Sequence, residues 1–253
     1  MKITFLGTGT SQGVPLIACT CEVCTSEDSR DKRLRTSILL EFNDIAIVVD
    51  TGPDFRQQML REKVKRLDAV LFTHEHKDHI AGLDDIRAFN FILKRKIDVY
   101  ASDRVQDAIR REFAYIFSDT KYPGIPEIEL HTIQNKPFEI QGIPVIPIEV
   151  LHYKLSVFAF RFGDFVYITD ANAISQQEKK KIMGCKILVI NALRRQAHVS
   201  HFTLQEALDL IAELKPEKAY LTHISHQLGK HSNIEKELPS GVFQAYDGLQ
   251  IQL

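Results

Sequence analysis

The segment from Phe72 to His79 constrains this chain more than any other part of its sequence. It reads Phe-Thr-His-Glu-His-Lys-Asp-His, so three histidines and an aspartate lie within six positions. A strand-like run, Ala69–Thr73, leads into it, and a helix pattern follows it through Phe89. Imidazole and carboxylate groups together suit zinc and similar divalent ions. The fold must therefore place this strand-to-helix turn at a metal site.

The spacing within the turn allows it to serve two ions. His74 and His76 can bind one ion, while Asp78 and His79 can bind a second. The alternative is a hydrophilic loop that happens to be rich in histidine. Solvated loops seldom concentrate ligand types in this way, so the pattern favours metal binding.

Further candidate ligands lie where other predicted strands end. They are His152 after Val145–Leu151, Asp170 after Phe165–Thr169, and His223 after Ala219–Thr222. Sites in layered sheet folds are commonly built at such strand ends. One of these residues alone would more often be structural, but three of them beside the histidine-rich turn predict a shared site.

His201 is expected at the same edge of the fold for a geometric reason. It precedes a predicted helix, Leu204–Leu214, which rises about 16 Å. The strand that follows, Ala219–His223, returns about 16 Å. The two lengths cancel, so His201 should lie near His223. The alternative is a surface histidine beside a helix cap.

A second cluster is formed by Cys19, Cys21 and Cys24, which are three of the four cysteines and lie within six positions. Structural zinc usually takes four cysteine and histidine ligands. Cys185 lies in an apolar segment and is expected to be a buried small side chain, so we choose His226 as the fourth ligand. The alternative is three free thiols on a flexible loop.

Short runs rich in Val, Ile and Phe predict strands, at Ile3–Leu6, Ser37–Phe42, Ile45–Asp50, Ala69–Thr73, Val145–Leu151, Val157–Phe162, Phe165–Thr169, Ile187–Ile190 and Ala219–Thr222. Thr203 and Glu206 predict a capping box at the start of the Leu204–Leu214 helix. No repeat or linker interrupts the 253 residues, so we expect one domain over 1–253, with sheets packed between helices.

Charge and hydropathy limit the classes of protein to which this chain can belong. Lys plus Arg is 32 and Asp plus Glu is 33, which argues against a general nucleic-acid coat. The apolar run at the N-terminus is too short for a signal peptide, and no segment approaches the roughly 18 apolar residues of a membrane span. We expect a soluble cytoplasmic protein that does not bind membranes.

The motif His-Glu-His-Lys-Asp-His at 74–79 resembles the HxHxDH signature of the metallo-β-lactamase superfamily. Asp50 resembles its early aspartate, and His152, Asp170 and His223 follow in the order of its remaining ligand positions. The resemblance implies an α+β fold: a four-layered αββα sandwich with two mixed sheets between helices. Because thioesterases, nucleases, lactamases and oxidoreductases share this signature, it does not by itself name the reaction.

Further motifs resemble the PhnP-type phosphodiesterases, which act on cyclic ribose phosphates. They are Gly-Thr-Gly-Thr-Ser-Gln-Gly-Val-Pro at 7–15, the three cysteines, Leu-Thr-His-Ile-Ser-His-Gln at 221–227, Leu-Pro-Ser-Gly at 238–241 and Tyr-Asp-Gly at 246–248. The resemblance implies a structural zinc on the cysteines and His226, a catalytic metal on His223, a catalytic role for His201, and a homodimer.

It also implies a mechanism with two catalytic divalent metals, zinc or manganese, that share a bridging hydroxide as nucleophile. His74, His76 and His152 would hold one ion, Asp78, His79 and His223 the other, and Asp170 would bridge them. Asp50 would orient a metal-bound histidine. His201 would contact the phosphate or protonate the leaving alkoxide.

The expected function is hydrolysis of a small phosphodiester, such as a cyclic ribose phosphate. The alternatives are a thioester or lactone hydrolase, an RNA-processing nuclease related to tRNase Z, and a metal-stabilised binding module. The chain shows no long inserted arm like that of tRNase Z, so RNA is not favoured. Segments 89–122 and 191–200 match the family pattern least and are expected to wall the pocket. Within the second, Arg194 and Arg195 could bind phosphate, although we expect at least one to be solvated.

Overall fold

The computed structural model describes residues 1–119 and 123–253. Within them, a seven-stranded sheet has the order β15-β1-β2-β3-β4-β5-β6. Its strands are β1 (Lys2–Gly7), β2 (Ser37–Phe42), β3 (Ile45–Val49), β4 (Ala69–Leu71), β5 (Ile97–Ala101), β6 (Ile128–Thr132) and β15 (Gln250–Gln252). β1 to β3 pair antiparallel and β3 to β6 pair parallel.

An eight-stranded sheet packs against the first. Along its path the order is β11-β8-β9-β10-β12-β13-β14, and β7 pairs with β8. Its strands are β7 (Phe138–Ile140), β8 (Ile143–His152), β9 (Leu155–Phe162), β10 (Phe165–Ile168), β11 (Ala173–Ile174), β12 (Ile187–Asn191), β13 (Lys218–Thr222) and β14 (Val242–Gln244). The parallel strands β10, β12 and β13 end at one edge.

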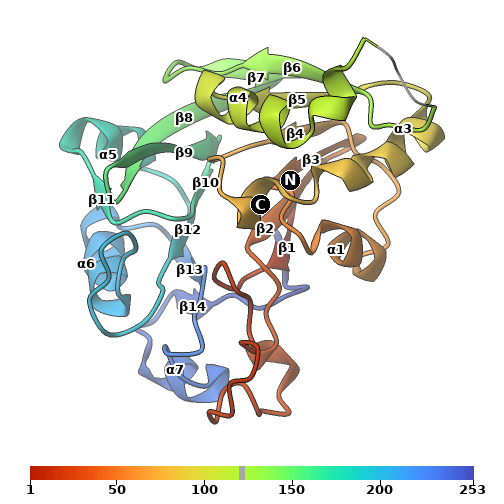
Figure 1. The fold of residues 1–253 in the computed structure, drawn as a ribbon. Helices are drawn as coiled ribbons and strands as arrows, with labels where there is room; N and C mark the ends of the chain where they lie inside the picture. The colour runs from red at the N-terminus through yellow and green to blue at the C-terminus, as the bar shows by residue number, and fades with distance from the viewer. Residues whose placement is uncertain (120–122) are drawn as a thin grey trace.

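Helices cover the outer faces of both sheets (Figure 1). The first sheet carries α1 (Phe55–Arg61), α2 (Lys77–Ile80), α3 (Arg87–Leu93) and α4 (Asp103–Glu112). The second carries α5 (Gln176–Ile182), α6 (Leu204–Leu214) and α7 (His231–Glu237). This arrangement confirms the predicted αββα sandwich. None of the helices in the described residues is long and apolar enough to cross a bilayer.

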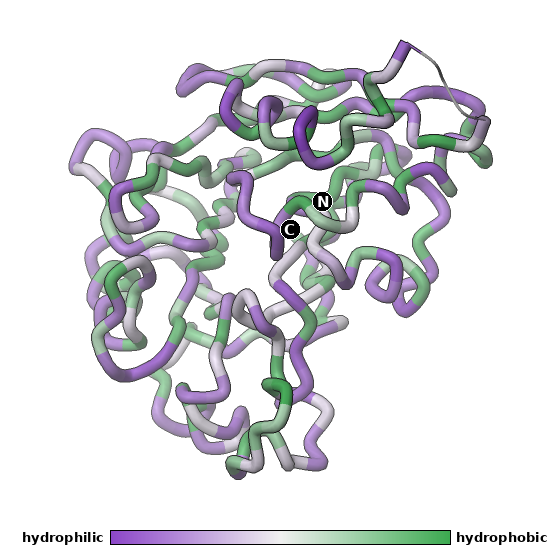
Figure 2. The backbone as a smooth tube through the Cα atoms, in the orientation of Figure 1, coloured by the Kyte–Doolittle hydropathy of each residue, from purple (hydrophilic) through white to green (hydrophobic). Residues whose placement is uncertain are grey.

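Strand alternation explains the layers. Val48 and Val70 pack with the helices, whereas the adjacent Ile47 and Leu71 pack between the sheets, since successive strand residues face opposite ways. Figure 2 shows hydrophobic segments along the inner strands and hydrophilic ones along the outer loops. Both faces of central strands such as β4, β10 and β12 are therefore buried, as their apolar sequences require.

The predicted helix at Leu204–Leu214 is confirmed with its bounds. Thr203 accepts a hydrogen bond from Glu206 N and Glu206 reaches back to Thr203 N, which completes the capping box. All nine predicted strands are also present, with ends that differ by up to two residues, while β5 to β7, β11, β14 and β15 were not predicted. Several of these are short or lie at sheet edges, where few apolar residues mark them.

The helix pattern after the histidine-rich turn is broken, contrary to the prediction. α2 ends at Ile80, a 3-10 turn follows at Leu83–Ile86, and α3 begins at Arg87. A Cβ on Gly82 would lie 2.1 Å from Gly52 O. The backbone after β3 therefore packs directly against this break, which holds the turn in place.

Candidate metal centre

Three of the residues expected at the site come directly after strands and have a left-handed backbone conformation. They are the orienting residue Asp50 and the candidate ligands Asp170 and His223. Asp50, Asp170 and His223 have φ of 64°, 57° and 54°. Such φ values are uncommon for residues other than glycine, and residues held there cluster at functional sites. All three side chains are buried, at no more than 2% exposure. The tight turns after β3, β10 and β13 thus direct these side chains into one place.

The first candidate ligand group consists of His74, His76 and His152, whose ligand atoms lie within 4.8 Å of one another. His74 Nε2 lies 3.0 Å from His76 Nδ1. His152 Nδ1 donates to Ser200 O at 2.9 Å, which leaves its Nε2 free to bind a cation. Burial, together with the nearby His79, lowers the pKa of His74 well below its usual value, so this imidazole is neutral, as a ligand must be.

The second group consists of Asp78, His79, Asp170 and His223. His79 Nε2 lies 3.2 Å from both Asp78 Oδ2 and Asp170 Oδ2, and His223 Nε2 lies 3.1 Å from Asp170 Oδ1. Within the described residues, both Nε2 atoms are buried without a hydrogen-bond partner. Unpaired polar atoms are rarely left buried, so their convergence on two carboxylates fits a bound cation.

The charges in this group lead to the same conclusion. Burial disfavours a charge on His79, yet the carboxylates of Asp78, Asp170 and Asp50 raise its pKa well above its usual value. Burial likewise opposes the charge on His223, but Asp170 and Asp78 raise its pKa to about 9. The buried carboxylates thus favour positive charge beside them. Without metal, protons on His79 and His223 supply this charge, and a bound divalent ion would replace those protons.

Asp50 lies where the predicted orienting role would place it. Its Oδ2 is 2.7 Å from His79 Nδ1. The same carboxylate accepts from Thr73 N at 2.9 Å and from Thr73 Oγ1 at 2.8 Å. These contacts tie the end of β3 to the turn after β4 and leave His79 Nε2 facing Asp78 and Asp170.

His201 and His223 lie at the same edge, as predicted from the element lengths. Their ring centroids are 4.6 Å apart, and His201 Nδ1 is 3.8 Å from Asp170 Oδ1. Burial and the neighbouring His223 lower the pKa of His201 to about 3, so its imidazole is neutral near pH 7. His152, Asp170 and His201 also form a group able to hold a cation. The structure thus places His201 within reach of a cation.

The cysteine cluster is brought together with His226. The distances from His226 Nδ1 to the sulfur atoms of Cys19, Cys21 and Cys24 are 3.4, 3.3 and 3.6 Å. Tetrahedral zinc would separate its sulfur and nitrogen ligands by roughly 3.5 Å, so the four residues fit zinc. A backbone hydrogen bond from Cys24, and then His226, lowers the pKa of Cys21 to about 6. Cys185 is buried elsewhere, as expected.

Sequence reasoning missed one buried arginine and its partners. Arg33 is only 3% exposed, and its Nη1 donates to Thr8 Oγ1 at 2.7 Å and to Ala245 O at 2.6 Å. Its Nη2 lies 3.3 Å from Nδ1 of His231, which is buried. Nothing in the sequence near Arg33 distinguishes it from a surface arginine, because its partners come from distant segments.

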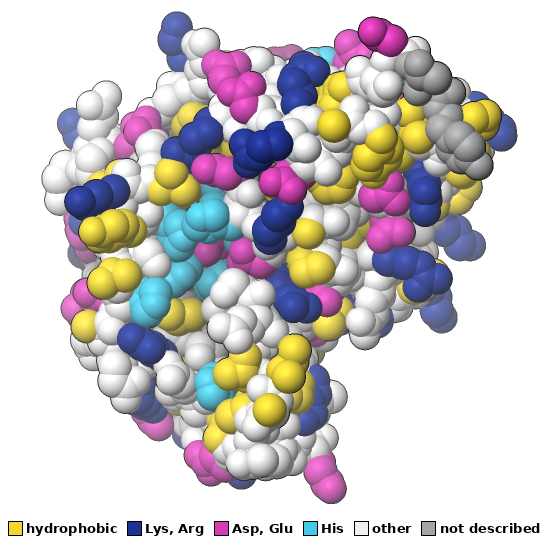
Figure 3. All heavy atoms as spheres, viewed as in Figure 1, with side chains coloured by type: hydrophobic (Ala, Val, Ile, Leu, Met, Phe, Trp, Pro, Cys, Tyr) yellow, Lys and Arg dark blue, Asp and Glu magenta, His cyan; other side chains and the backbone are white. Residues whose placement is uncertain are grey.

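A cavity of about 470 Å³ opens beside the first ligand group. Its lining residues are Glu75, His76, His152, Tyr153, Lys154, Leu155, Val199 and Ser200. Figure 3 shows histidine side chains gathered in a hollow on this face, with acidic side chains beside them. A substrate in the cavity would therefore contact the metal centre directly.

The predicted pocket walls are borne out for one segment only. Segment 191–200 supplies Val199 and Ser200. No residue of 89–119 lines the cavity, and 120–122 lie outside the described residues. Arg194 donates to Gln227 Oε1 at 2.9 Å, and Arg195 pairs with Glu237 at 2.6 Å. Both arginines are thus engaged by the protein itself.

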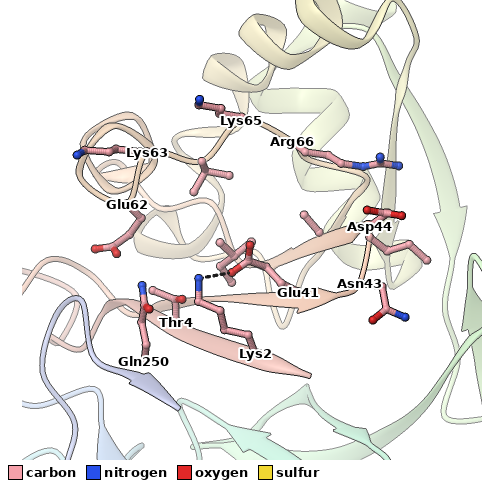
Figure 4. Close-up of a pocket in the computed structure, with 14 residues that line it drawn as sticks. Lys2, Thr4, Glu41, Asn43, Asp44, Glu62, Lys63, Lys65, Arg66 and Gln250 are labelled. Atoms are coloured by element: carbon pink, nitrogen blue, oxygen red, sulfur yellow. Dashed lines mark ion pairs between the residues drawn. The ribbon is translucent and has the colours of Figure 1, made fainter. Parts of the chain in front are cut away.

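A separate cavity of about 310 Å³ lies between the first sheet and the segment after α1 (Figure 4). Its charges are mixed: Lys2 pairs with Glu41 at 2.8 Å, and Lys63, Lys65 and Asp44 also line it. None of its lining residues is a candidate metal ligand, so the chemistry of the chain is concentrated at the other cavity.

Comparison with known proteins places this geometry in context. The family model of the beta-lactamase superfamily domain matches residues 46–224. An octanoyltransferase of Porphyromonas gingivalis is 39% identical over 254 residues, which cover 99% of this chain and 51% of that protein. A ribonuclease Z of a Nostoc species is 28% identical over 65% of this chain and 47% of that protein. The chain thus spans about half the length of these curated relatives.

Solved structures extend the likeness. A crystal structure of a diphosphatase from the PhnP family superposes with a TM-score of 0.94 at 36% identity, covering 100% of this chain and 97% of that one. Zinc-bound PqqB from Methylobacterium extorquens superposes with a TM-score of 0.81 at 20% identity, covering all of both chains. The second likeness shows the fold alone.

Proposed function

Because this chain belongs to the metallo-β-lactamase superfamily and to its PhnP-type branch, we propose that this metal-dependent hydrolase cleaves a small phosphodiester or diphosphate linkage. The observation that carries the proposal is the pair of ligand groups, which fit two cations and adjoin where the rings of His74 and His79 lie 4.1 Å apart. The diphosphatase that resembles it over the whole chain acts on phosphate linkages by its name. A small cyclic ribose phosphate fits the same chemistry.

In this proposal His74, His76 and His152 would hold one divalent ion, and Asp78, His79, Asp170 and His223 would hold the other. Zinc or manganese suits such nitrogen and oxygen ligands. Bound metals of this kind supply a nucleophilic water near neutral pH and neutralise phosphate oxygens. Cys19, Cys21, Cys24 and His226 would hold a third metal, a structural zinc.

The chain's own side chains position the reaction. Asp50 holds His79 in one orientation through the 2.7 Å contact. His201 faces Asp170 and is neutral near pH 7, so its ring N–H donates a hydrogen bond to a phosphoryl oxygen rather than carrying a positive charge. The low pKa favours this role over protonation of the leaving alkoxide.

A second candidate is hydrolysis of a thioester, and one observation favours it. The P. gingivalis relative is named an octanoyltransferase, and octanoyl transfer is acyl chemistry. However, this chain aligns with only about half of that protein. RNA cleavage, suggested by the ribonuclease Z relatives, is less favoured because the formal charge is −1.

Hydrolysis of bis(p-nitrophenyl) phosphate, compared with that of an octanoyl thioester, separates the candidates. Each substrate is offered to the protein with manganese and with zinc. The proposal predicts turnover of the phosphodiester and little turnover of the thioester. Faster thioester hydrolysis under both metals would replace it with the second candidate.

A further inference from the structure

The turn between β8 and β9 forms one wall of the cavity beside the metal centre. His152 pairs with Leu155 in the hairpin register, so Tyr153 and Lys154 are its two turn residues. All four residues line the cavity. Because His152 belongs to the first ligand group, the cavity that Tyr153 lines adjoins the proposed reaction centre.

Tyr153 occupies an unfavourable backbone conformation. Its φ is 58°, a region where a bulky side chain is an outlier and glycine would be at ease. Asn172 Oδ1 accepts a hydrogen bond from Tyr153 N at 2.6 Å and so fixes the turn. The residue is 54% exposed, which means that the hydrophobic core gains little from its ring. A fold that needed only the turn would be better served by glycine.

Lys154 brings positive charge to the same wall. Its Nζ lies 5.3 Å from the centre of the Tyr153 ring. Among the described residues it forms no ion pair, whereas the carboxylate of Glu75 across the cavity is paired with Arg104 at 3.1 Å. The ammonium thus covers one face of the ring, and the wall presents the other face together with a cation that no carboxylate in the described part of the chain neutralises.

We propose that Tyr153 and Lys154 form a recognition site for a nucleotide, in which the base stacks on the Tyr153 ring and the Lys154 ammonium contacts a phosphate. This inference rests on the proposed function, since it identifies the organic group of the phosphate substrate. Base stacking on an exposed aromatic side chain is a common and strong contact. It suits a cavity of about 470 Å³, within the range of pockets for small organic ligands.

An acyl chain fits this wall less well. Burial of a hydrocarbon is favourable in proportion to the area removed from water, so it needs an enclosed tunnel. Here Val199 is 70% exposed and Tyr153 54% exposed, so the wall is open. A base stacks with only one of its faces covered. An acyl chain carries no negative charge that could pair with the ammonium of Lys154.

Binding of adenosine monophosphate compared with ribose 5-phosphate tests the proposal by calorimetry on the full chain loaded with zinc. The two ligands share the ribose and the phosphate and differ in the base. We expect adenosine monophosphate to bind about tenfold more tightly or better. In Tyr153→Gly this preference disappears, while ribose 5-phosphate binds as before. Lys154→Ala weakens both ligands by a similar factor.

The variants are chosen so that a loss of base preference cannot be attributed to a loss of folding. Tyr153→Gly suits a positive φ, so its melting temperature should equal or exceed that of the parent chain. Tyr153→Phe keeps the ring and should keep the base preference. Tyr115→Ala removes an exposed tyrosine that does not line the cavity and serves as the matched control.

Equal binding of the two ligands by the parent chain would overturn the proposal, as would a base preference that survives in Tyr153→Gly. Both readouts are equilibrium binding. Failure to hydrolyse bis(p-nitrophenyl) phosphate would therefore count against the proposed function alone, and the binding measurements would still decide the role of Tyr153.

Discussion

Asp50 Oδ2 lies 2.7 Å from His79 Nδ1, and both side chains are fully buried. The contact joins the end of β3 to the histidine-rich turn, 29 residues further along the chain. It fixes which ring nitrogen of His79 faces Asp78 and Asp170. A carboxylate in this position acts on a cation through the histidine rather than by direct contact.

Asp50→Asn should therefore weaken metal binding without removing a ligand. We expect the affinity for one divalent ion to fall by about 10–100-fold, with activity restored at higher metal concentration. Titration of the chelated protein with zinc measures the effect. Asp68→Asn is the matched control, because Asp68 is an equally buried carboxylate paired with Arg66 and Arg95 away from the site. Unchanged affinity in Asp50→Asn would mean that Asp50 does not orient a metal ligand.

His201→Ala should retain the full metal complement and lose about 10²-fold in kcat. Since the pKa of His201 is lowered to about 3 by burial and His223, the neutral imidazole is a poor proton donor to a leaving group at pH 7. The loss should thus be the same for an alkoxide and for p-nitrophenolate as leaving group. A loss confined to the alkoxide would restore the general-acid role, and loss of a metal would make His201 a ligand.

Cys21→Ser should lower the melting temperature more than Asp78→Ala does, because a structural zinc contributes to folding while catalytic ions exchange. Elemental analysis should show one tightly held zinc lost from the cysteine variant only. Cys185→Ser, which removes a buried thiol far in sequence from the loop, should keep that zinc. An equal or smaller loss of stability in Cys21→Ser would mean that the loop is no folded metal site.

The pH dependence of thiol alkylation tests the same loop without zinc. The pKa of Cys21 is lowered to about 6, by the Cys24 backbone and then by His226, whereas burial raises that of Cys24 to about 11. In protein from which the structural zinc has also been removed, Cys21 should react with iodoacetamide. The rate should rise with pH around a midpoint near 6, as the thiolate forms. Cys24 should stay unreactive. A midpoint for Cys21 near the ordinary thiol value of about 9 would contradict this environment.

We also propose that the chain forms a homodimer, on the strength of its resemblance to PhnP-type enzymes. Sedimentation at micromolar concentration should then give twice the 28.9 kDa mass of one chain. A mass of one chain under these conditions would refute the dimer.

The features that could be predicted are those that depend on residues close together in the sequence. The histidine-rich turn and the residues ending predicted strands identify themselves by residue type and spacing. The approach of His201 to His223 could also be predicted, because it depends only on the rise of one helix and one strand.

The remainder depends on distant segments. The left-handed turns at Asp50, Asp170 and His223 have no marker such as glycine, since packing imposes them. The break between α2 and α3 arises where Gly52 meets Gly82. The role of Tyr153 and Lys154 in the cavity wall was missed because it also depends on distant segments. In the sequence alone, a tyrosine in a two-residue turn looks like an ordinary surface residue, and only the fold brings it to the cavity that His76 lines.

Metal reconstitution tests the central claim most directly. The protein is chelated until only the structural zinc remains, and hydrolysis of bis(p-nitrophenyl) phosphate is followed as manganese is added back. We expect no turnover at the start and a rise that is complete when two further equivalents are bound, because the two ligand groups act together. Full activity with one equivalent, or turnover that persists after chelation, would contradict a two-metal phosphodiester hydrolase.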